Sequence, residues 1–420
     1  MLLRKNPLLG KYLGLGWISC IGDALYYIAL MTYAASSDNP GLGILIITIS
    51  STLPQLFNVI LGALADSIKS KTHRIIQSGV FRGLIFILIA FIIRETNALW
   101  GLLVIGLLNA MSDTAGSFSA LLKTPFMRLI SKDEELEQGI GIDQSVRGAI
   151  DGIAGFFGVL LLSFLGIYYL AFFNAFLFFL VAFGFKLLSR TFKSIEQKIE
   201  PPQIVSINDF NAHIQHSIKT LINIKPLRNF FLVGAAMNAI LATAVPVMLM
   251  MLADNPSSWV LNFELSVTIG KAGLLGVGIF AGLAGPKYCK KIGTSAALLM
   301  AMTGMLLFTL IIWTGFVWVA FAALFFSMFA ATMFSIRLNS FLLQAVPLET
   351  LGTISGAIGL FLSILPIPFA IMLNSLAAFS IAVYSMAGAV LIVFVIILIL
   401  VMKFDKMDLK ETIMSLNKGL

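Results

Sequence analysis

The sequence is poor in charge, cysteine and histidine. Only 11% of its 420 residues are charged and 59% are hydrophobic, whereas a soluble domain carries about 25% charged residues. So large a deficit indicates that most of the surface faces lipid. Cys20 lies in an apolar segment and Cys289 in a basic loop, which predicts neither a disulfide framework nor a cysteine metal site. The three histidines, His73, His213 and His216, lie in polar loops, which argues against a metal cage inside the membrane.

The chain also lacks the sequence features of an enzyme. It contains no phosphate-binding glycine-rich loop followed by Lys and Ser or Thr, so ATP is not expected as the direct energy source. No polar segment is long enough for a soluble catalytic domain. We therefore expect no enzyme activity, no cofactor and no metal. The net charge of +8 comes from lysines and arginines in loops, and it does not predict nucleic acid as a partner.

Long apolar runs are abundant. A spanning helix needs about 20 mostly apolar residues, and the interior of a bilayer admits only helices or closed barrels. The runs predict an all-α polytopic membrane protein with twelve transmembrane helices. They cover residues 11–33, 41–65, 75–95, 98–122, 140–165, 168–189, 229–253, 261–285, 294–314, 316–336, 350–372 and 376–402.

The basic residues predict the orientation of these helices. With the N-terminus in the cytoplasm, 24 of the 28 lysines and arginines fall on the cytoplasmic side and only Arg94 on the other. The remaining three, Arg82, Arg147 and Lys271, fall inside helices. This bias predicts a multi-pass protein of a bacterial cytoplasmic membrane, with both termini in the cytoplasm.

The longest polar stretch, residues 190–228, separates six helices from six. It predicts an N-terminal six-helix bundle (1–190), a cytoplasmic linker with a short amphipathic helix (191–228), a C-terminal six-helix bundle (229–402) and a cytoplasmic tail (403–420).

The two halves resemble each other. Gly62-Ala-Leu-Ala precedes a basic loop after the second helix, and Gly282-Leu-Ala-Gly precedes another after the eighth. Two six-helix repeats are typical of transporters, whose substrate site lies between the repeats near the midplane. A second match, at a constant offset of 215 residues, pairs Phe126, Glu134, Leu136 and Gly141 with Phe341, Glu349, Leu351 and Gly356.

The loop after the second helix resembles the signature loop of the major facilitator superfamily. It reads Gly62-Ala-Leu-Ala-Asp66-Ser-Ile-Lys69-Ser-Lys71-Thr-His-Arg74, with the glycine, the aspartate and the basic tail of that family. Ser67 replaces the usual basic residue and Lys69 the usual glycine. The resemblance implies that this loop contacts the end of the eleventh helix in one state and releases it in the other. It therefore assigns gating to Asp66, Lys69 and Arg74, although the basic residues would also serve as a solvated anchor.

Three further stretches resemble the macrolide-efflux-like drug:proton antiporters of that superfamily. They are Ile21-Gly-Asp-Ala-Leu-Tyr-Tyr-Ile-Ala-Leu30, Phe81-Arg82-Gly-Leu and Leu343-Gln-Ala-Val-Pro-Leu-Glu-Thr-Leu-Gly352. This resemblance covers essentially the whole chain and implies export. The segment Asp66-Ser-Ile-Lys also resembles lysophospholipid transporters of the same superfamily, which keeps a lipid substrate as an alternative.

Ionisable side chains inside the membrane are costly and usually functional. Asp23, midway along the first helix, is the first candidate for a protonation site because low dielectric favours proton binding by a carboxylate. Ser19, Tyr26 and Tyr27 beside it would line a polar cavity. Alternatively, Asp23 braces a neighbouring helix. Asp113, near the cytoplasmic end of the fourth helix, is a second candidate.

The fifth helix carries Asp143, Arg147 and Asp151 at i, i+4 and i+8, so charges of alternating sign stack on one face. Arg147 can fully neutralise only one carboxylate, and the other needs a proton or another partner such as Arg82, to which we also assign gating. The ladder is either a structural network or a proton relay.

The eighth helix carries Glu264 and Lys271. At 1.5 Å per residue Lys271 lies roughly 10 Å from the outer end, too deep to snorkel easily. We expect Lys271 to pair with Asp23 or another carboxylate across the two halves, or to face a cavity.

Methionines of the seventh helix, Met237 and Met248 among them, suit a pliable substrate pocket, although packing alone also explains them. The sequence thus predicts a monomeric secondary transporter that exports an amphipathic drug or toxin in exchange for protons, by alternating access. Lysophospholipid or other lipid transport is the alternative within this class. A non-transporting membrane receptor is the rival from another class, and the intramembrane charges argue against it.

Overall fold

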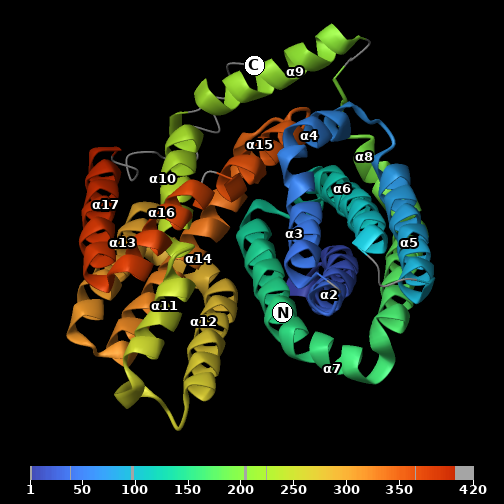
Figure 1. Ribbon diagram of the computed structural model, residues 1–420. Coiled ribbons are helices and arrows are strands. Elements are labelled where there is room, and N and C mark those ends of the chain that lie inside the picture. Colours follow the sequence, from blue (N-terminus) through green and yellow to red (C-terminus); the bar gives the residue numbers. More distant parts are fainter. Residues whose placement is uncertain are drawn as a thin grey trace. The chain divides into compact units, whose positions relative to one another are not determined.

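The computed structural model describes residues 2–37, 39–95, 99–202, 206–223, 225–364 and 366–402. Its regular structure in these residues is helical, which confirms the all-α class (Figure 1). The cytoplasmic tail predicted over residues 403–420 lies outside them. The division of the chain into two bundles joined by a linker stays a prediction.

The first nine helices contain the first six predicted apolar runs and the helix predicted in the linker. They are α1 (Leu2–Lys5), α2 (Pro7–Ala35), α3 (Pro40–Leu56), α4 (Asn58–Ser67), α5 (Lys71–Glu95), α6 (Leu99–Ile130), α7 (Asp133–Leu187), α8 (Ser189–Glu196) and α9 (Ile207–Asn223).

The later helices cover the remaining runs, but runs 229–253 and 350–372 each divide into two helices, and two short 3-10 turns lie at loops. They are α10 (Lys225–Leu241), α11 (Ala244–Asp254), η1 (Pro256–Ser258), α12 (Phe263–Ile292), α13 (Thr294–Ile311), η2 (Ile312–Thr314), α14 (Val317–Ala345), α15 (Leu351–Ile364), α16 (Pro366–Phe379) and α17 (Ile381–Met402).

Ten helices of the described residues are long and apolar enough to cross a membrane, and eleven if the bent pair α3 and α4 forms one span. These two helices meet at 47°, one turn after Pro54, which cannot donate an intrahelical hydrogen bond. The remaining predicted run, 140–165, falls in the first limb of α7, where three charges lower its hydropathy. The protein is therefore a multi-pass helical membrane protein.

Asn-Pro pairs start two of these helices. The side chain of Asn6 accepts a hydrogen bond from the amide of Leu9, and the side chain of Asn39 accepts one from the amide of Leu42. A proline follows each asparagine at the first helical position, where its missing N–H is not needed and its fixed φ suits a helix.

The long helix α7 is a helical hairpin. Gly166 has φ 74° and ψ 159°, a conformation that only glycine adopts easily, and the chain reverses there (Figure 1). The turn falls between the predicted runs 140–165 and 168–189, so α7 contains both predicted helices.

The chain forms two compact units. The first comprises Met1–Leu136, Ala149–Thr220 and Val346–Leu360, and the second comprises Glu137–Gly148, Leu221–Ala345 and Phe361–Leu420. Boundaries between the units fall within α7 and within α15, so each of these two helices contributes residues to both units. In the first, α5 packs on α6 and α3 on α6, and in the second, α14 packs on α12 and α13.

The first unit has an aromatic core close to its charged residues. Phe86 of α5 lies edge-on to Tyr26, with ring centroids 4.7 Å apart, and stacks on Phe178 at 5.4 Å. These rings pack with Leu30 and Ile89 in one buried cluster. Such a core holds α2, α5 and the second limb of α7 together, and so fixes the backbone that carries Asp23 and Arg82.

Candidate functional site

An ion pair joins α2 to α5 inside the first unit. Nη2 of Arg82 lies 2.6 Å from Oδ1 of Asp23. The arginine side chain is 7% exposed, whereas the aspartate side chain is 42% exposed. Asp23 is thus both paired and accessible, which is the arrangement that a reversible protonation site requires.

Arg82 is held by more than this one carboxylate. Its Nε donates to Oγ of Ser112 at 3.2 Å and its Nη1 donates to Oγ of Ser19 at 3.3 Å. The guanidinium also lies 3.9 Å from the centre of the Phe178 ring. A planar guanidinium can make all these contacts at once, and a lysine ammonium cannot.

Asp113 lies on α6, directly after Ser112. Its Oδ2 accepts a hydrogen bond from Nδ2 of Asn109 at 3.0 Å, and the same amide group donates to Oγ of Ser50 at 3.3 Å. For Asp113 this amide is the hydrogen-bond partner recorded within the described chain, and it is uncharged. The hydrogen bond that Asp113 accepts here therefore comes from a neutral group.

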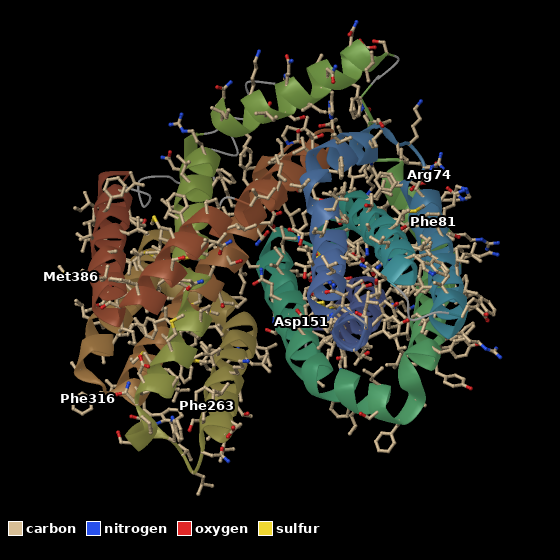
Figure 2. The ribbon with its side chains drawn as sticks, in the orientation of Figure 1. Arg74, Phe81, Asp151, Phe263, Phe316 and Met386 are labelled. Carbon is tan, nitrogen blue, oxygen red and sulfur yellow. The ribbon has the colours of Figure 1, made fainter. Side chains whose placement is uncertain are left out.

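The other predicted cavity residues of the first unit have different surroundings. Oδ1 of Asp151 lies 3.9 Å from Sγ of Cys20, and Asp151 is exposed on α7 (Figure 2). Tyr26 is 2% exposed and faces the aromatic core, whereas Tyr27 is 40% exposed. Of these two tyrosines only Tyr27 is open to a ligand.

The second unit contains the remaining predicted charges. Nε of Arg147 lies 3.0 Å from Oδ2 of Asp143, so this half of the predicted ladder forms, and Arg82 pairs with Asp23. Glu264, in the first turn of α12, and Lys271 are both exposed within their unit. Pairing of Lys271 across the two halves stays a prediction.

The carboxylate of Asp66 caps the N-terminus of α15. Its Oδ1 accepts the amide of Gly352 at 2.7 Å, and its Oδ2 accepts the amide and the hydroxyl of Thr353 at 2.8 and 2.6 Å. The first amides of a helix have no partner within the helix, and the positive end of its dipole attracts an anion. Asp66 is therefore a capping residue supplied by another helix, some 286 positions away in the sequence.

The basic residues of this loop divide into two kinds. Lys69 and Arg74 are exposed, and Arg74 contacts Gln77 at 2.9 Å, on the outer side of α5 (Figure 2). Lys71 is 2% exposed. Its Nζ donates to the backbone oxygens of Ala65 and Asp66, the latter at 3.3 Å. Lys71 therefore holds the turn that presents Asp66, whereas Lys69 and Arg74 are exposed beside it.

In both units, a glycine of one helix packs directly against the backbone of another helix. A Cβ at Gly62 of α4 would overlap the carbonyl of Gly352 in α15, and a Cβ at Gly141 of α7 would overlap the carbonyl of Gly282 in α12. Gly62 and Gly282 are the equivalent positions of the predicted repeat. The position equivalent to Asp66 is Pro286, so the acidic cap exists only in the first unit.

A cavity of about 310 Å³ lies in the second unit, between α10, α15 and α16. Its lining is apolar apart from two side chains, and it consists of Asn238, Ala242, Leu362, Ser363, Pro366, Ile367 and Ala370. Prolines stand four residues after Ala242 and Leu362, so the carbonyls of these two residues have no amide donor one turn later. The cavity thus combines an apolar wall with the polar side chains of Asn238 and Ser363.

The predicted methionine pocket is not this cavity. Met237 and Met248 are 4% and 0% exposed, and a Cβ added at Gly270 would lie only 3.2 Å from Sδ of Met248. Both side chains contribute to the interior of the second unit, as the packing alternative expects.

Several residues of these clusters carry no signal in the sequence. Thr353 and Ser112 are ordinary helix residues there, and His213, whose Nε2 lies 3.4 Å from Oδ2 of Asp66, is one polar position of the predicted linker. Arg128, whose Nη1 donates to the carbonyl of Val346 at 2.6 Å, reads as one of many cytoplasmic basic residues. Only their long-range contacts identify them, and a single sequence does not contain these.

The many apolar spans, with paired charges among their helices, define a multi-pass helical membrane protein. The family model described as Major Facilitator Superfamily matches residues 12–370. The chain belongs to this superfamily, and it is a secondary transporter and not an enzyme. A search of curated protein sequences gives no match.

Solved structures show the same fold at low sequence identity. A bacterial homologue of the iron transporter ferroportin in the outward-facing state is 13% identical, with a TM-score of 0.70 over 95% of this chain and 99% of that chain. The human organic anion transporter MFSD10 (TETRAN) is 14% identical, with a TM-score of 0.67 over 93% and 99%. FucP, a superfamily transporter in the outward conformation, is 13% identical, with a TM-score of 0.61 over 94% and 98%.

Proposed function

We propose that this transporter exports an amphipathic small molecule from a bacterial cytoplasm in exchange for protons. The observation that carries the proposal is the ion pair of Asp23 and Arg82, buried at the arginine and accessible at the aspartate. Proton binding to Asp23 would remove the charge that holds Arg82. A coupled transporter needs such a group, whose proton occupancy changes the contacts between its helices.

The cap on α15 supplies the second part of the mechanism. In alternating access, contacts between helices at one face must form in one state and break in the other. Asp66 makes three hydrogen bonds to α15 that depend on its present position. We assign Asp66 and Lys71 to this latch, with Lys69 and Arg74 as solvated charges beside it.

The cavity in the second unit supports the proposed class of substrate. Its apolar lining would accept the apolar part of an amphiphile, and Asn238, Ser363 and the carbonyls of Ala242 and Leu362 would accept hydrogen bonds from its polar part. None of the lining residues is charged. A neutral or weakly basic amphiphile with N–H or O–H donors suits this composition better than an anion does.

The relatives do not narrow the substrate further. Iron and organic anions appear as substrates in the names of two similar structures. At sequence identities of 13% and 14%, these structures are evidence for a shared fold and not for a shared substrate. Export itself rests on the resemblance of residues 21–30, 81–84 and 343–352 to macrolide-efflux-like antiporters.

The decisive experiment uses the purified chain in liposomes with an imposed pH gradient. A panel of neutral, basic and anionic amphiphiles, with lysophospholipids included, is offered on the side that bears the linker. We expect basic or neutral amphiphiles to move against their gradient and protons to move the opposite way. Lipid movement that ignores the pH gradient would instead support the lipid transporter.

A further inference from the structure

Prolines follow two of the residues that line the cavity of the second unit. This cavity lies where α10 packs on α16 (Figure 1). Pro246 stands four residues after Ala242, and Pro366 stands four residues after Leu362. In a helix, the carbonyl of each residue accepts a hydrogen bond from the amide four residues later, and a proline has no such amide. The carbonyls of Ala242 and Leu362 therefore lack their usual donor.

The turn that carries Ala242 is fixed by side chains. It lies between α10 and α11, and the hydroxyl of Thr243 donates to the carbonyl of Ile240 at 2.8 Å. The hydroxyl of Tyr384, which belongs to α17 and is 1% exposed, lies 3.0 Å from the same Thr243 oxygen. Because Thr243 has one hydroxyl hydrogen, Tyr384 is the donor in this contact. The turn is thus a packed part of the second unit.

Both carbonyls lie at a depth where water is scarce. Ala242 and Leu362 are close to the middle of the predicted runs 229–253 and 350–372. The hydrocarbon region supplies no hydrogen-bond donors, so a backbone group without a helical partner is tolerated there only inside protein or in a cavity. The cavity that these two residues line is therefore the place from which a donor can reach them.

The polar side chains of the lining add two further oxygens. Asn238 stands one turn before Ala242, and Ser363 follows Leu362 directly. In the part of the chain that the structure describes, no hydrogen bond is recorded for either of these side chains. With the two carbonyls, the cavity therefore offers four oxygen acceptors.

These acceptors favour one kind of headgroup. A primary or secondary ammonium group carries several N–H donors and a positive charge, and hydrogen bonds from a charged donor are the stronger ones. A carboxylate has only acceptors, and a quaternary ammonium group has no N–H. Four oxygens are also fewer than the roughly six to eight that a calcium ion takes. The apolar part of the lining, with Ile367 and Ala370, suits the hydrocarbon part of an amine.

We propose that this cavity binds the ammonium headgroup of the transported amphiphile and selects primary and secondary amines over quaternary ones. The carbonyls of Ala242 and Leu362 accept its N–H groups, and the amide oxygen of Asn238 accepts a third. This inference rests on the proposed function, since it names the headgroup of the substrate in the same cavity. The selection against quaternary cations follows from the carbonyls, because an apolar cavity without free acceptors would bind both kinds of cation alike.

Four compounds with the same hydrocarbon chain test the headgroup: hexylamine, hexyltrimethylammonium, hexanol and hexanoate. Their binding to the full chain in lipid nanodiscs is measured by equilibrium dialysis near neutral pH, and binding to empty nanodiscs is subtracted. We expect hexylamine to bind roughly tenfold more tightly than hexyltrimethylammonium or hexanol, the size of one charge-assisted hydrogen bond. Hexanoate should bind most weakly.

Variants test the acceptors one at a time. Pro366→Ala supplies an amide one turn after Leu362, and Asn238→Leu removes the amide oxygen. Each should weaken hexylamine roughly three- to tenfold and leave hexyltrimethylammonium unchanged, whereas damage to the fold would weaken both compounds. The matched controls are Pro286→Ala, inside α12, and Asn339→Leu, at an exposed position of α14, and both should keep the preference of the unmodified chain.

The results that overturn the inference and the proposed function differ. Equal binding of hexylamine and hexyltrimethylammonium, or no binding of hexylamine, overturns the headgroup assignment. So does a preference for hexylamine that persists in both Pro366→Ala and Asn238→Leu, because the amine then binds elsewhere. Proton-coupled export of other amphiphiles in liposomes would leave the proposed function standing in each of these cases. If no compound binds and no amphiphile moves in liposomes, the proposed function fails together with the inference.

Discussion

Arg82 is the residue on which the charge cluster of the first unit depends. Breaking a buried ion pair from one side costs about 3–5 kcal/mol, and the exposure of Asp23 lowers this expectation. A double-mutant cycle of Arg82→Ala and Asp23→Ala, measured by unfolding in mild detergent, should therefore give a coupling energy of about 1–3 kcal/mol.

Arg147 and Asp143 are the matched control for this cycle. They also form an arginine–aspartate pair, but their side chains are 42% and 25% exposed and lie one turn apart on a single helix. Their coupling should be only about 0.3–0.5 kcal/mol. Equal coupling in the two pairs would show that burial of Arg82 contributes nothing, and would remove the main support for its role.

Among the helices, the glycine contacts give the sharpest test. A Cβ at Gly141 would overlap the carbonyl of Gly282, whereas a Cβ at Gly148, two turns further along α7, meets no atom within 4 Å. Gly141→Ala should therefore disfavour the observed packing of α7 on α12, and Gly148→Ala should not. Crosslinking between cysteines at Ser145 of α7 and Ile279 of α12, where Oγ of Ser145 donates to the carbonyl of Ile279 at 2.9 Å, measures this packing. Equal crosslinking in both variants would contradict the contact.

The sequence predicts helices much better than it predicts their contacts. Apolar runs longer than a bilayer leave one physical solution, so every predicted run has its helix, and Gly166 separates two of them where the pattern breaks. The pairing of Asp23 with Arg82 was not predicted, since three cations within the membrane were available and only tertiary packing selects one. The contact of Asp66 with α15 was expected from family resemblance, and the contact of His213 with Asp66 was not expected at all.

For the whole molecule, the excess of lysines and arginines on one side predicts the topology, with both termini and the linker in the cytoplasm. Ser194 lies in α8, at the start of the predicted linker, and Asn39 caps the first turn of α3. In the variant lacking Cys20 and Cys289, single cysteines at these two positions should react with an impermeant thiol reagent from opposite sides of the membrane. Labelling from the same side would reject the predicted topology.

Coupling is a property of the whole transporter, and it depends on which carboxylate exchanges the proton. Asp23→Asn fixes that position in a form that resembles the protonated one, and it releases Arg82 permanently. Substrate exchange down its own gradient should then continue, because alternating access itself needs no charge there. Accumulation driven by a pH gradient should be lost, since no proton moves.

Substrate exchange and pH-driven accumulation must both be measured in liposomes and normalised to the amount of folded protein. If Asp23 only braces α2, its replacement should lower the amount of folded protein and leave coupling intact in the molecules that fold. Asp143→Asn is the control, as that carboxylate is also paired with an arginine and should leave coupling unchanged. Gradient-driven accumulation retained in Asp23→Asn would exclude Asp23. The same measurement on Asp113→Asn would then decide the matter, because Asp113 lies next to the serine that binds Arg82 and its recorded hydrogen bond comes from the neutral amide of Asn109. Ser112, which accepts a hydrogen bond from Arg82, is the residue before Asp113. A change in the charge of Asp113 would therefore act on Arg82, and the same arginine would link either carboxylate to the helices around it.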